Sequence, residues 1–130
     1  MTYLSATFKQ AIADGSAWRS TFEALRHDGK RLTEGWTTPH FAVEDSKVIH
    51  YHINGTWEGD GYVITHLRTG YAVMSFAAHH VALNFMLELE RLFADDDLLD
   101  SDVKKRLVQY INSRGKHICQ TLFPKGRKAA

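Results

Sequence analysis

The sequence has a single cysteine, Cys119, and no long run of apolar residues. One cysteine excludes an intramolecular disulfide and every zinc site built from several cysteines. A helix that spans a membrane needs roughly 18 consecutive apolar residues, and no segment of this chain approaches that length. The opening MTYLSATFKQ also lacks the basic and then apolar order of a secretory signal. We therefore expect a cytoplasmic protein that has no disulfide and does not enter a membrane.

Catalytic and nucleotide-binding motifs of high specificity are absent as well. The glycine-rich segment GTWEGDG, residues 55–61, lacks the lysine and the following helix that a phosphate-binding loop requires. No arrangement of serine, histidine and aspartate along the chain indicates a catalytic triad. We therefore expect no cofactor, and we expect a binding protein rather than an enzyme.

The composition is that of one ordinary globular domain. The chain has 130 residues, of which 44% are hydrophobic and 24% are charged, and its formal net charge is +1. This length buries a sizeable core without a metal or a disulfide. The near-zero net charge gives no overall attraction to nucleic acid. There is no internal repeat or low-complexity linker, so residues 1–130 form a single predicted domain.

Residues 1–29 predict N-terminal helices. Apolar residues recur at helical spacing before the helix-ending pair Asp14-Gly15: Leu4, Phe8, Ala11 and Ile12. A second helix is expected from Ser16 to Gly29, because FEAL favours a helix and glycine suits its end. The alternative is a strand followed by a tight hairpin at Asp28-Gly29, since WRSTFEAL also alternates between apolar and polar residues.

Residues 30–76 predict an antiparallel meander. Segments of extended character alternate with turn signals: RLTEGW, His40–Val43, VIHYHI, YVITHLR and YAVMSF. Asn54-Gly55 is the strongest hairpin signal in the chain, and it places Trp57 opposite His52. The sheet is therefore expected to consist of neighbouring strands joined by short turns.

The last hairpin, around Thr69-Gly70, decides which side chains share a face. A two-residue loop pairs Arg68 with Tyr71 and leaves the apolar side chains on the other face. We interpret the resulting mixed aromatic and basic face as a ligand-binding surface of four residues: Tyr62, His66, Arg68 and Tyr71. The alternative, a three-residue loop with a glycine bulge, pairs Leu67 with Tyr71 and separates this set.

Two C-terminal helices are predicted within residues 78–123. The first, Ala78–Phe93, is apolar on nearly all sides and so requires cover on two of them. One cover is the sheet, and the other is the last helix or a second subunit, so we expect a homo-oligomer through this helix. The last helix is expected from Ser101 to about Arg114, with a basic tail over residues 124–130. The predicted fold class is thus α+β, an antiparallel meander packed on one side by helices.

Two histidines, His50 and His52, project from the same face of one predicted strand. This spacing binds zinc or copper if a third ligand arrives from elsewhere. The chain has eight histidines, so such pairs also arise by chance, as surface or stacked side chains. We assign no metal ligand, and a metal-dependent hydrolase is our third hypothesis.

Charge is divided unevenly along the C-terminal part of the chain. Residues 88–102 contain seven acids and one base, whereas residues 103–130 contain eight bases and no acid. Acids before a helix and bases toward its end also suit the helix dipole. The functional interpretation is a basic arm that contacts phosphates of nucleic acid or of a nucleoprotein. The expected nucleic-acid-binding residues are Lys104, Lys105, Lys116, Lys125, Arg127 and Lys128.

The segment TFEALRHDGKRLTEGW, residues 21–36, resembles the opening of a family of small phage proteins that sequester nucleotide signals of the Thoeris defence. The family's later tryptophan-containing ending is not found in this chain. The segment THLRTG before a helix is likewise similar to parts of other phage proteins. These resemblances imply a phage or mobile-element origin, and no functional residue is carried across. They suggest a second hypothesis, an inhibitor of a host protein or a protein that sequesters a nucleotide signal.

Overall fold

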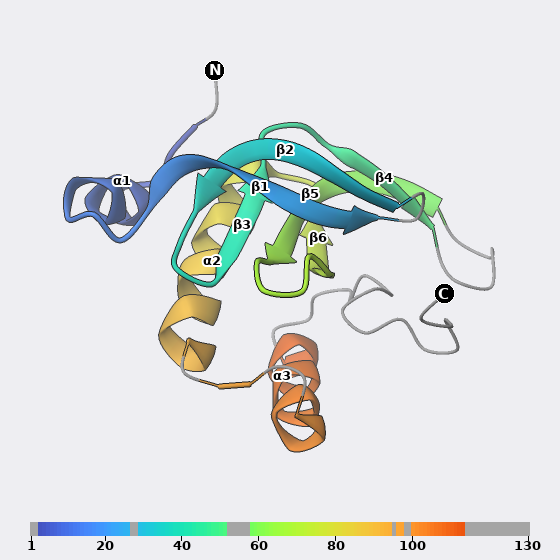
Figure 1. The fold of residues 1–130 in the computed structure, drawn as a ribbon. Coiled ribbons are helices and arrows are strands. Elements are labelled where there is room, and N and C mark those ends of the chain that lie inside the picture. The colour runs from blue at the N-terminus through green and yellow to red at the C-terminus, as the bar shows by residue number, and fades with distance from the viewer. Residues whose placement is uncertain (1–2, 27–28, 52–57, 95, 98–99, 114–130) are drawn as a thin grey trace.

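The computed structural model describes residues 3–26, 29–51, 58–94, 96–97 and 100–113. It shows the predicted α+β fold, an antiparallel sheet packed against helices (Figure 1). In chain order the elements are α1 (Ala6–Ala13), β1 (Trp18–Arg26), β2 (Gly29–Thr37), β3 (Phe41–Glu44), β4 (Val48–Tyr51), β5 (Glu58–His66), β6 (Ala72–Phe76), α2 (His79–Phe93) and α3 (Ser101–Ser113). Within these described ranges no helix combines the length and the apolar character needed to cross a membrane.

The second predicted N-terminal helix is wrong, because this segment forms the strand β1. It pairs with β2 along its whole length, from Trp18 opposite Thr37 to Arg26 opposite Gly29. Phe22 and Ala24 are buried while Thr21 and Glu23 are exposed, which is the period-two pattern of the rejected alternative. Continuous pairing with a neighbouring strand outweighs the weak helix preference of FEAL.

The sheet is antiparallel as predicted, but its strand order, β1-β2-β3-β5-β4 with β6 also paired with β5, is not that of a meander, because β3 pairs with β5 instead of with the next strand in the chain, β4. β2 pairs with β3, and then β3 and β4 pair with successive parts of β5, which also carries β6. The sheet curls, and Figure 1 shows the β1–β2 hairpin arching over the other strands. The amide of Leu25 in β1 donates to the carbonyl of Gly70 in the β5–β6 turn at 2.7 Å. The curl therefore brings the first strand back to the last turn.

The preferred register of the β5–β6 hairpin is also wrong. Tyr62 pairs with Phe76 and Ile64 with Met74, which is the alignment of the three-residue alternative. The register then shifts after Ile64, so that Thr65 pairs with Ala72. The turn at residues 67–70 is closed by the His66 amide, which donates to the Tyr71 carbonyl at 2.9 Å. A bulge thus separates side chains that an uninterrupted ladder would place side by side.

The helix α2 lies across the sheet and contacts β3, β5, β6 and α1. Its buried side chains come from several sides of the helix: His79, Ala82, Leu83, Phe85, Met86, Leu89 and Phe93. The helix α3 covers a further side, where the Tyr110 ring lies 5.9 Å from Phe85 and 6.1 Å from Phe93. The cover that the apolar pattern demanded is therefore supplied within the chain, and a homo-oligomer through Ala78–Phe93 stays a prediction.

The sheet face opposite α2 is not left open where the strands curl. Phe22, Ala24 and Ala42 form a second small core there, with Leu67 packed against it. Ala42 and Val43 are successive residues of β3, so they point to opposite faces, and Val43 belongs to the main core. This part of the sheet face is therefore covered by the protein's own side chains and is not open to a ligand.

Candidate functional site

The four residues expected to form one ligand-binding surface lie in different environments. Tyr62 is half-buried, and its ring stacks on the ring of His79 at 4.5 Å and 13°. His79 begins α2, so the helix covers the side of Tyr62 that was expected to face a ligand. On this ring the Lys47 ammonium also lies 5.9 Å from the centroid. Tyr62 is therefore engaged by the protein itself.

His66 closes the β5–β6 turn from inside. Its side chain is 5% exposed, and Nδ1 lies 2.9 Å from the Thr69 hydroxyl. Burial, reinforced by the charges of Arg68 and His40, lowers the pKa of His66 to about 4. The ring is therefore neutral at physiological pH and is not presented to a ligand.

Arg68 and Tyr71 do not join the other two residues. Arg68 extends from the turn into solvent and pairs with Asp97 at 3.1 Å. Tyr71 is half-buried and packs against the main core. The bulge after Ile64 and the cover from α2 together explain why the structure does not bring this set to one open face.

The predicted phosphate-contacting residues are only partly within the described residues. Lys104 is half-buried and Lys105 exposed on α3, whereas Lys116, Lys125, Arg127 and Lys128 lie outside the described ranges. Four arginines with described side chains each have a carboxylate partner: Arg19 with Asp45, Arg31 with Glu44, Arg68 with Asp97 and Arg106 with Asp96. A phosphate at any of these arginines therefore competes with a carboxylate that is already paired there.

A metal site receives no support from the residues that the structure describes. Among them, no group of three or more histidine, cysteine, aspartate or glutamate side chains is placed to hold an ion. The side chain of His50 and all of His52 lie outside the described part, as do Asn54-Gly55 and Trp57. The hydrolase hypothesis thus stays a prediction.

An open, mostly apolar groove of about 780 Å³ lies between α1, α2 and the turn after β2. We call it the α1–α2 groove. From α1 and the loop after it the lining residues are Ala6, Thr7, Gln10, Ala11, Asp14 and Ser16. From the turn and α2 they are Thr38, Pro39, Leu87, Glu90, Arg91 and Ala94.

The α1 wall is fixed by its first turn. Ser5 caps α1 by accepting from the Phe8 amide at 3.1 Å, and its hydroxyl donates to Asn84 of α2 at 2.7 Å. Phe8 is fully buried, and its ring lies 5.5 Å from the Trp36 ring in an edge-to-face arrangement. A helix of this length is marginal by itself, so these contacts determine where α1 lies.

The wall formed by the turn after β2 is held by hydrogen bonds on two sides. The His40 amide donates to Glu90 Oε1 at 2.9 Å, and His40 Nδ1 lies 2.6 Å from Glu90 Oε2. From the other side the Leu67 amide donates to the His40 carbonyl at 3.0 Å. The elements that bound the groove are therefore held in place by hydrogen bonds within the chain itself.

Three ionisable residues line the groove, and they differ in how they are used. Glu90 is engaged by His40, as described above. Asp14 accepts from the hydroxyl and the amide of Ser16, and these hydrogen bonds lower the pKa of Asp14, which keeps it ionised at neutral pH. Arg91 is exposed, and no ion pair joins it to another described residue. Apart from Glu90, which is paired with His40, the rim thus presents one negative group, Asp14, and one positive group, Arg91, beside an apolar floor.

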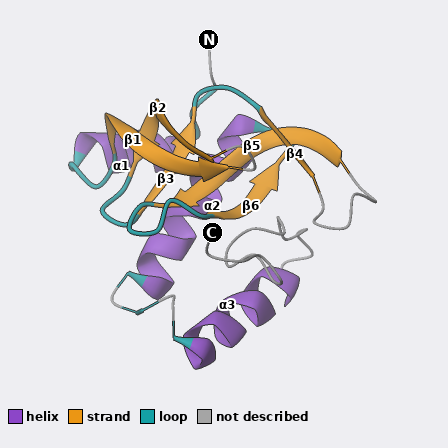
Figure 2. Cartoon of the chain, turned by 45° about the vertical axis from the view of Figure 1, so that its right-hand side comes forward, coloured by secondary structure: helices purple, strands orange, loops and turns teal. Residues whose placement is uncertain are grey.

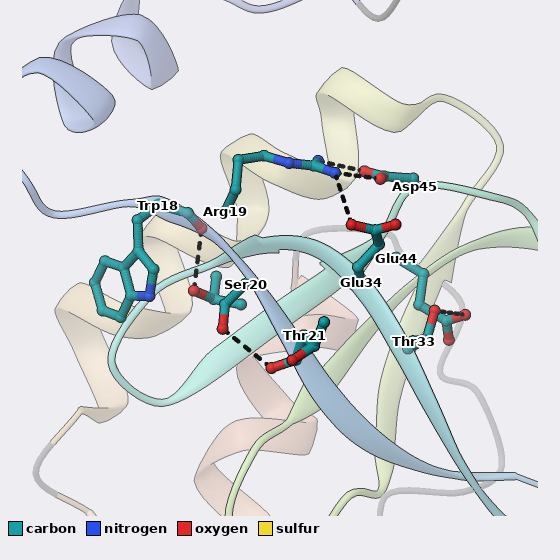
Figure 3. A network of polar contacts seen from close by, with 9 residues as sticks. Trp18, Arg19, Ser20, Thr21, Thr33, Glu34, Glu44 and Asp45 are labelled. Atoms are coloured by element: carbon teal, nitrogen blue, oxygen red, sulfur yellow. Dashed lines mark hydrogen bonds and ion pairs between the residues drawn. The ribbon is translucent and has the colours of Figure 1, made fainter.

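A smaller hollow of about 490 Å³ lies beside the β1–β2 hairpin. It is lined by Thr21, Leu32, Thr33, Glu34, Asp45 and Ser46. Two nitrogens of Arg19 donate to Asp45, at 2.6 and 2.5 Å, and one of them lies 3.8 Å from Glu34. Figure 3 shows these contacts. The Arg19 guanidinium also lies 5.2 Å from the Trp36 ring centroid. These contacts join β1 to the loop after β3, so this cluster is structural.

A buried carboxylate near this hollow is structural as well. Glu44 is 2% exposed, and its Oε2 accepts from Arg31 at 2.6 Å and from Thr33 at 3.2 Å (Figure 3 shows the contact with Thr33). Both partners come from β2, the strand that pairs with β3. The ion pair therefore links these two strands by their side chains.

The α1–α2 groove was not predicted from the sequence. The available signal was the width of the apolar surface of α2, which was attributed to the last helix or a second subunit. No protein-family model, curated protein or solved structure matches the chain. Function is therefore inferred from the groove and its chemistry.

Proposed function

We propose that the chain is a non-enzymatic binding protein that holds a segment of a partner protein in the α1–α2 groove. The observation that carries this proposal is the groove itself, about 780 Å³ with fixed walls and a mostly apolar lining. Binding sites typically combine an apolar hollow of this size with a few polar groups that orient the ligand. Asp14 and Arg91 are the groups that serve this purpose here.

Phosphate-bearing ligands fit the groove poorly. A nucleotide brings several negative charges, whereas Asp14 and Glu90 are acidic and Arg91 is the one base in the lining. This distribution favours a protein segment over a nucleotide signal. A host protein as the partner is consistent with the short resemblance to phage proteins that act on host defences.

The proposal is tested by selecting displayed random protein segments against the folded chain. Each enriched segment is then measured against two variants that fill the groove, Gln10→Trp and Thr7→Trp, both at exposed positions of α1. Thr21→Trp, which places the same bulk at the smaller hollow, is the matched control. Circular dichroism and thermal melting establish that all three variants fold.

We expect both groove variants to weaken binding by tenfold or more, the loss of about 1.4 kcal/mol of binding free energy, while Thr21→Trp leaves it unchanged. The proposal is contradicted if the enriched segments bind the unaltered chain and all three variants equally, or if the selection enriches no segment.

Nucleic-acid binding is the second candidate, favoured by the eight bases and no acids of residues 103–130. Its test is titration of labelled single and double strands at two salt concentrations. Binding that weakens steeply with salt supports this candidate. Absence of binding at low salt removes it.

A further inference from the structure

The walls of the α1–α2 groove are helices and a turn, and no lining residue belongs to a strand. An extended peptide in this groove finds no strand edge to pair with, so its backbone amides and carbonyls lie over apolar atoms without partners. A helix forms its backbone hydrogen bonds internally and needs none from the groove. The lining therefore favours a helical occupant.

The length of the groove limits the length of this occupant. On α2 the lining residues recur at helical spacing from Leu87 to Ala94, a rise of about 10 Å. The α1 wall extends for eight residues, about 12 Å. Both walls match about two turns of a partner helix.

The charges at the rim of the groove limit the amino-acid composition of the bound helix. Asp14 ends α1, where the helix dipole is negative, and the last turn of α1 contains no basic residue. A base from the partner is therefore favoured beside Asp14. Arg91 likewise favours an acid from the partner.

We infer that the α1–α2 groove receives about two turns of an amphipathic helix of the partner, whose apolar stripe is flanked by a base toward Asp14 and an acid toward Arg91. This inference rests on the proposed function and specifies the shape and charge of the bound segment. The same apolar stripe contacts the floor around Ala11 and Leu87.

The experiment compares two displayed libraries of equal length on the full chain. One has an amphipathic helical pattern with the flanking charges varied, and the other has prolines spaced to prevent a helix. Enriched peptides are measured against Asp14→Asn and Arg91→Gln, which remove each charge while keeping similar side-chain size. Asn retains the oxygen that accepts from Ser16. Glu34→Gln, at the smaller hollow, is the control for general loss of negative charge.

We expect enrichment from the helical library alone, with a base and an acid beside the stripe. Asp14→Asn should weaken peptides that carry the base about fivefold, and Arg91→Gln should do the same for those that carry the acid. Glu34→Gln should have no effect. This inference is overturned if proline-containing peptides bind in the groove, or if helical peptides bind Asp14→Asn and Arg91→Gln as tightly as the unaltered chain. Either result is still compatible with the proposed function. If Gln10→Trp and Thr7→Trp weaken the binding of no enriched peptide, the inference and the proposed function are both contradicted.

Discussion

His66 places a titratable ring inside the turn that supports one wall of the groove. The folded protein keeps this ring neutral because its pKa lies near 4, below the usual 6.5. The unfolded chain takes up a proton at about 6.5, so the stabilisation is present above that pH and is lost as the pH falls toward 4. The loss amounts to about 3 kcal/mol in the free energy of unfolding.

Urea unfolding at several pH values between 7 and 4 measures this effect. The matched variant is His66→Asn, which retains a polar atom near the Thr69 hydroxyl but does not titrate. We expect the free energy of unfolding of the variant to fall less steeply over this range. Parallel pH curves for the two proteins would show that His66 does not titrate as described.

Glu44 is the second residue whose environment predicts a measurable effect. In Arg31→Met the carboxylate stays in a site that is 2% exposed while its guanidinium partner is gone. We expect the free energy of unfolding at pH 7 to fall by about 2 kcal/mol, less than for a fully buried pair because Arg31 is itself half exposed. Denaturant unfolding provides the measurement.

The control for this loss is Arg68→Met, which breaks a pair exposed on both sides. Such pairs contribute little, so a change within about 0.5 kcal/mol is expected. Equal losses in the two variants are incompatible with a special role for the buried carboxylate.

At the scale of elements, the close approach of β2 and β3 depends on Gly35. A Cβ at this position would lie 1.9 Å from the Val43 carbonyl oxygen, and backbone atoms cannot move aside without separating the strands. We expect Gly35→Ala to cost more than about 3 kcal/mol in the free energy of unfolding, or to prevent folding. Circular dichroism and denaturant unfolding distinguish these outcomes.

Gly29→Ala is the appropriate comparison, because nothing lies within 4 Å of the added Cβ and only its φ of +117° is unfavourable. That strain costs about 1–2 kcal/mol. If Gly35→Ala is no more harmful than Gly29→Ala, then the strands do not approach as closely as described.

The first turn of α2 lacks a stabilising side-chain cap. Ala78 occupies the N-cap with an extended backbone, φ −110° and ψ 133°, and its side chain makes no capping hydrogen bond. Ala78→Ser is expected to raise the free energy of unfolding by about 1 kcal/mol and the melting temperature by about 4 °C. Thermal melting of Ala77→Ser, one residue before the cap, should show no rise. A similar rise in both variants argues against a capping effect.

Most of the helices and strands could be predicted from the sequence. The segments of α1, α2 and α3 and of the strands β2 to β6 were predicted because their periodicity and turn signals are local. β1 was assigned as a helix because FEAL has helix-forming residues, and the deciding partner strand lies beyond the segment itself. The hairpin register failed for a related reason, since the bulge after Ile64 is not visible in the alternation of YVITHLR. The groove was not predicted because its lining comes from segments far apart in the chain.

At the scale of the whole molecule, the helices have different relations to the sheet. Figures 1 and 2 both show α3 below the sheet and away from α1. α3 covers α2 through Tyr110, whereas the side of α2 that contains Glu90 and Arg91 faces the groove. The long apolar helix thus serves as the centre of the core and also as one wall of the proposed binding site.

The most direct test of this account is amide NMR of the folded chain with and without a segment enriched by the selection. We predict that the largest shift changes occur along α1, at the turn of residues 38–40 and over residues 87–94. Little change is expected in the β1–β2 hairpin and in α3. Changes concentrated in the hairpin or in α3, with the groove amides unmoved, would contradict the claim that the α1–α2 groove is where this protein binds its partner.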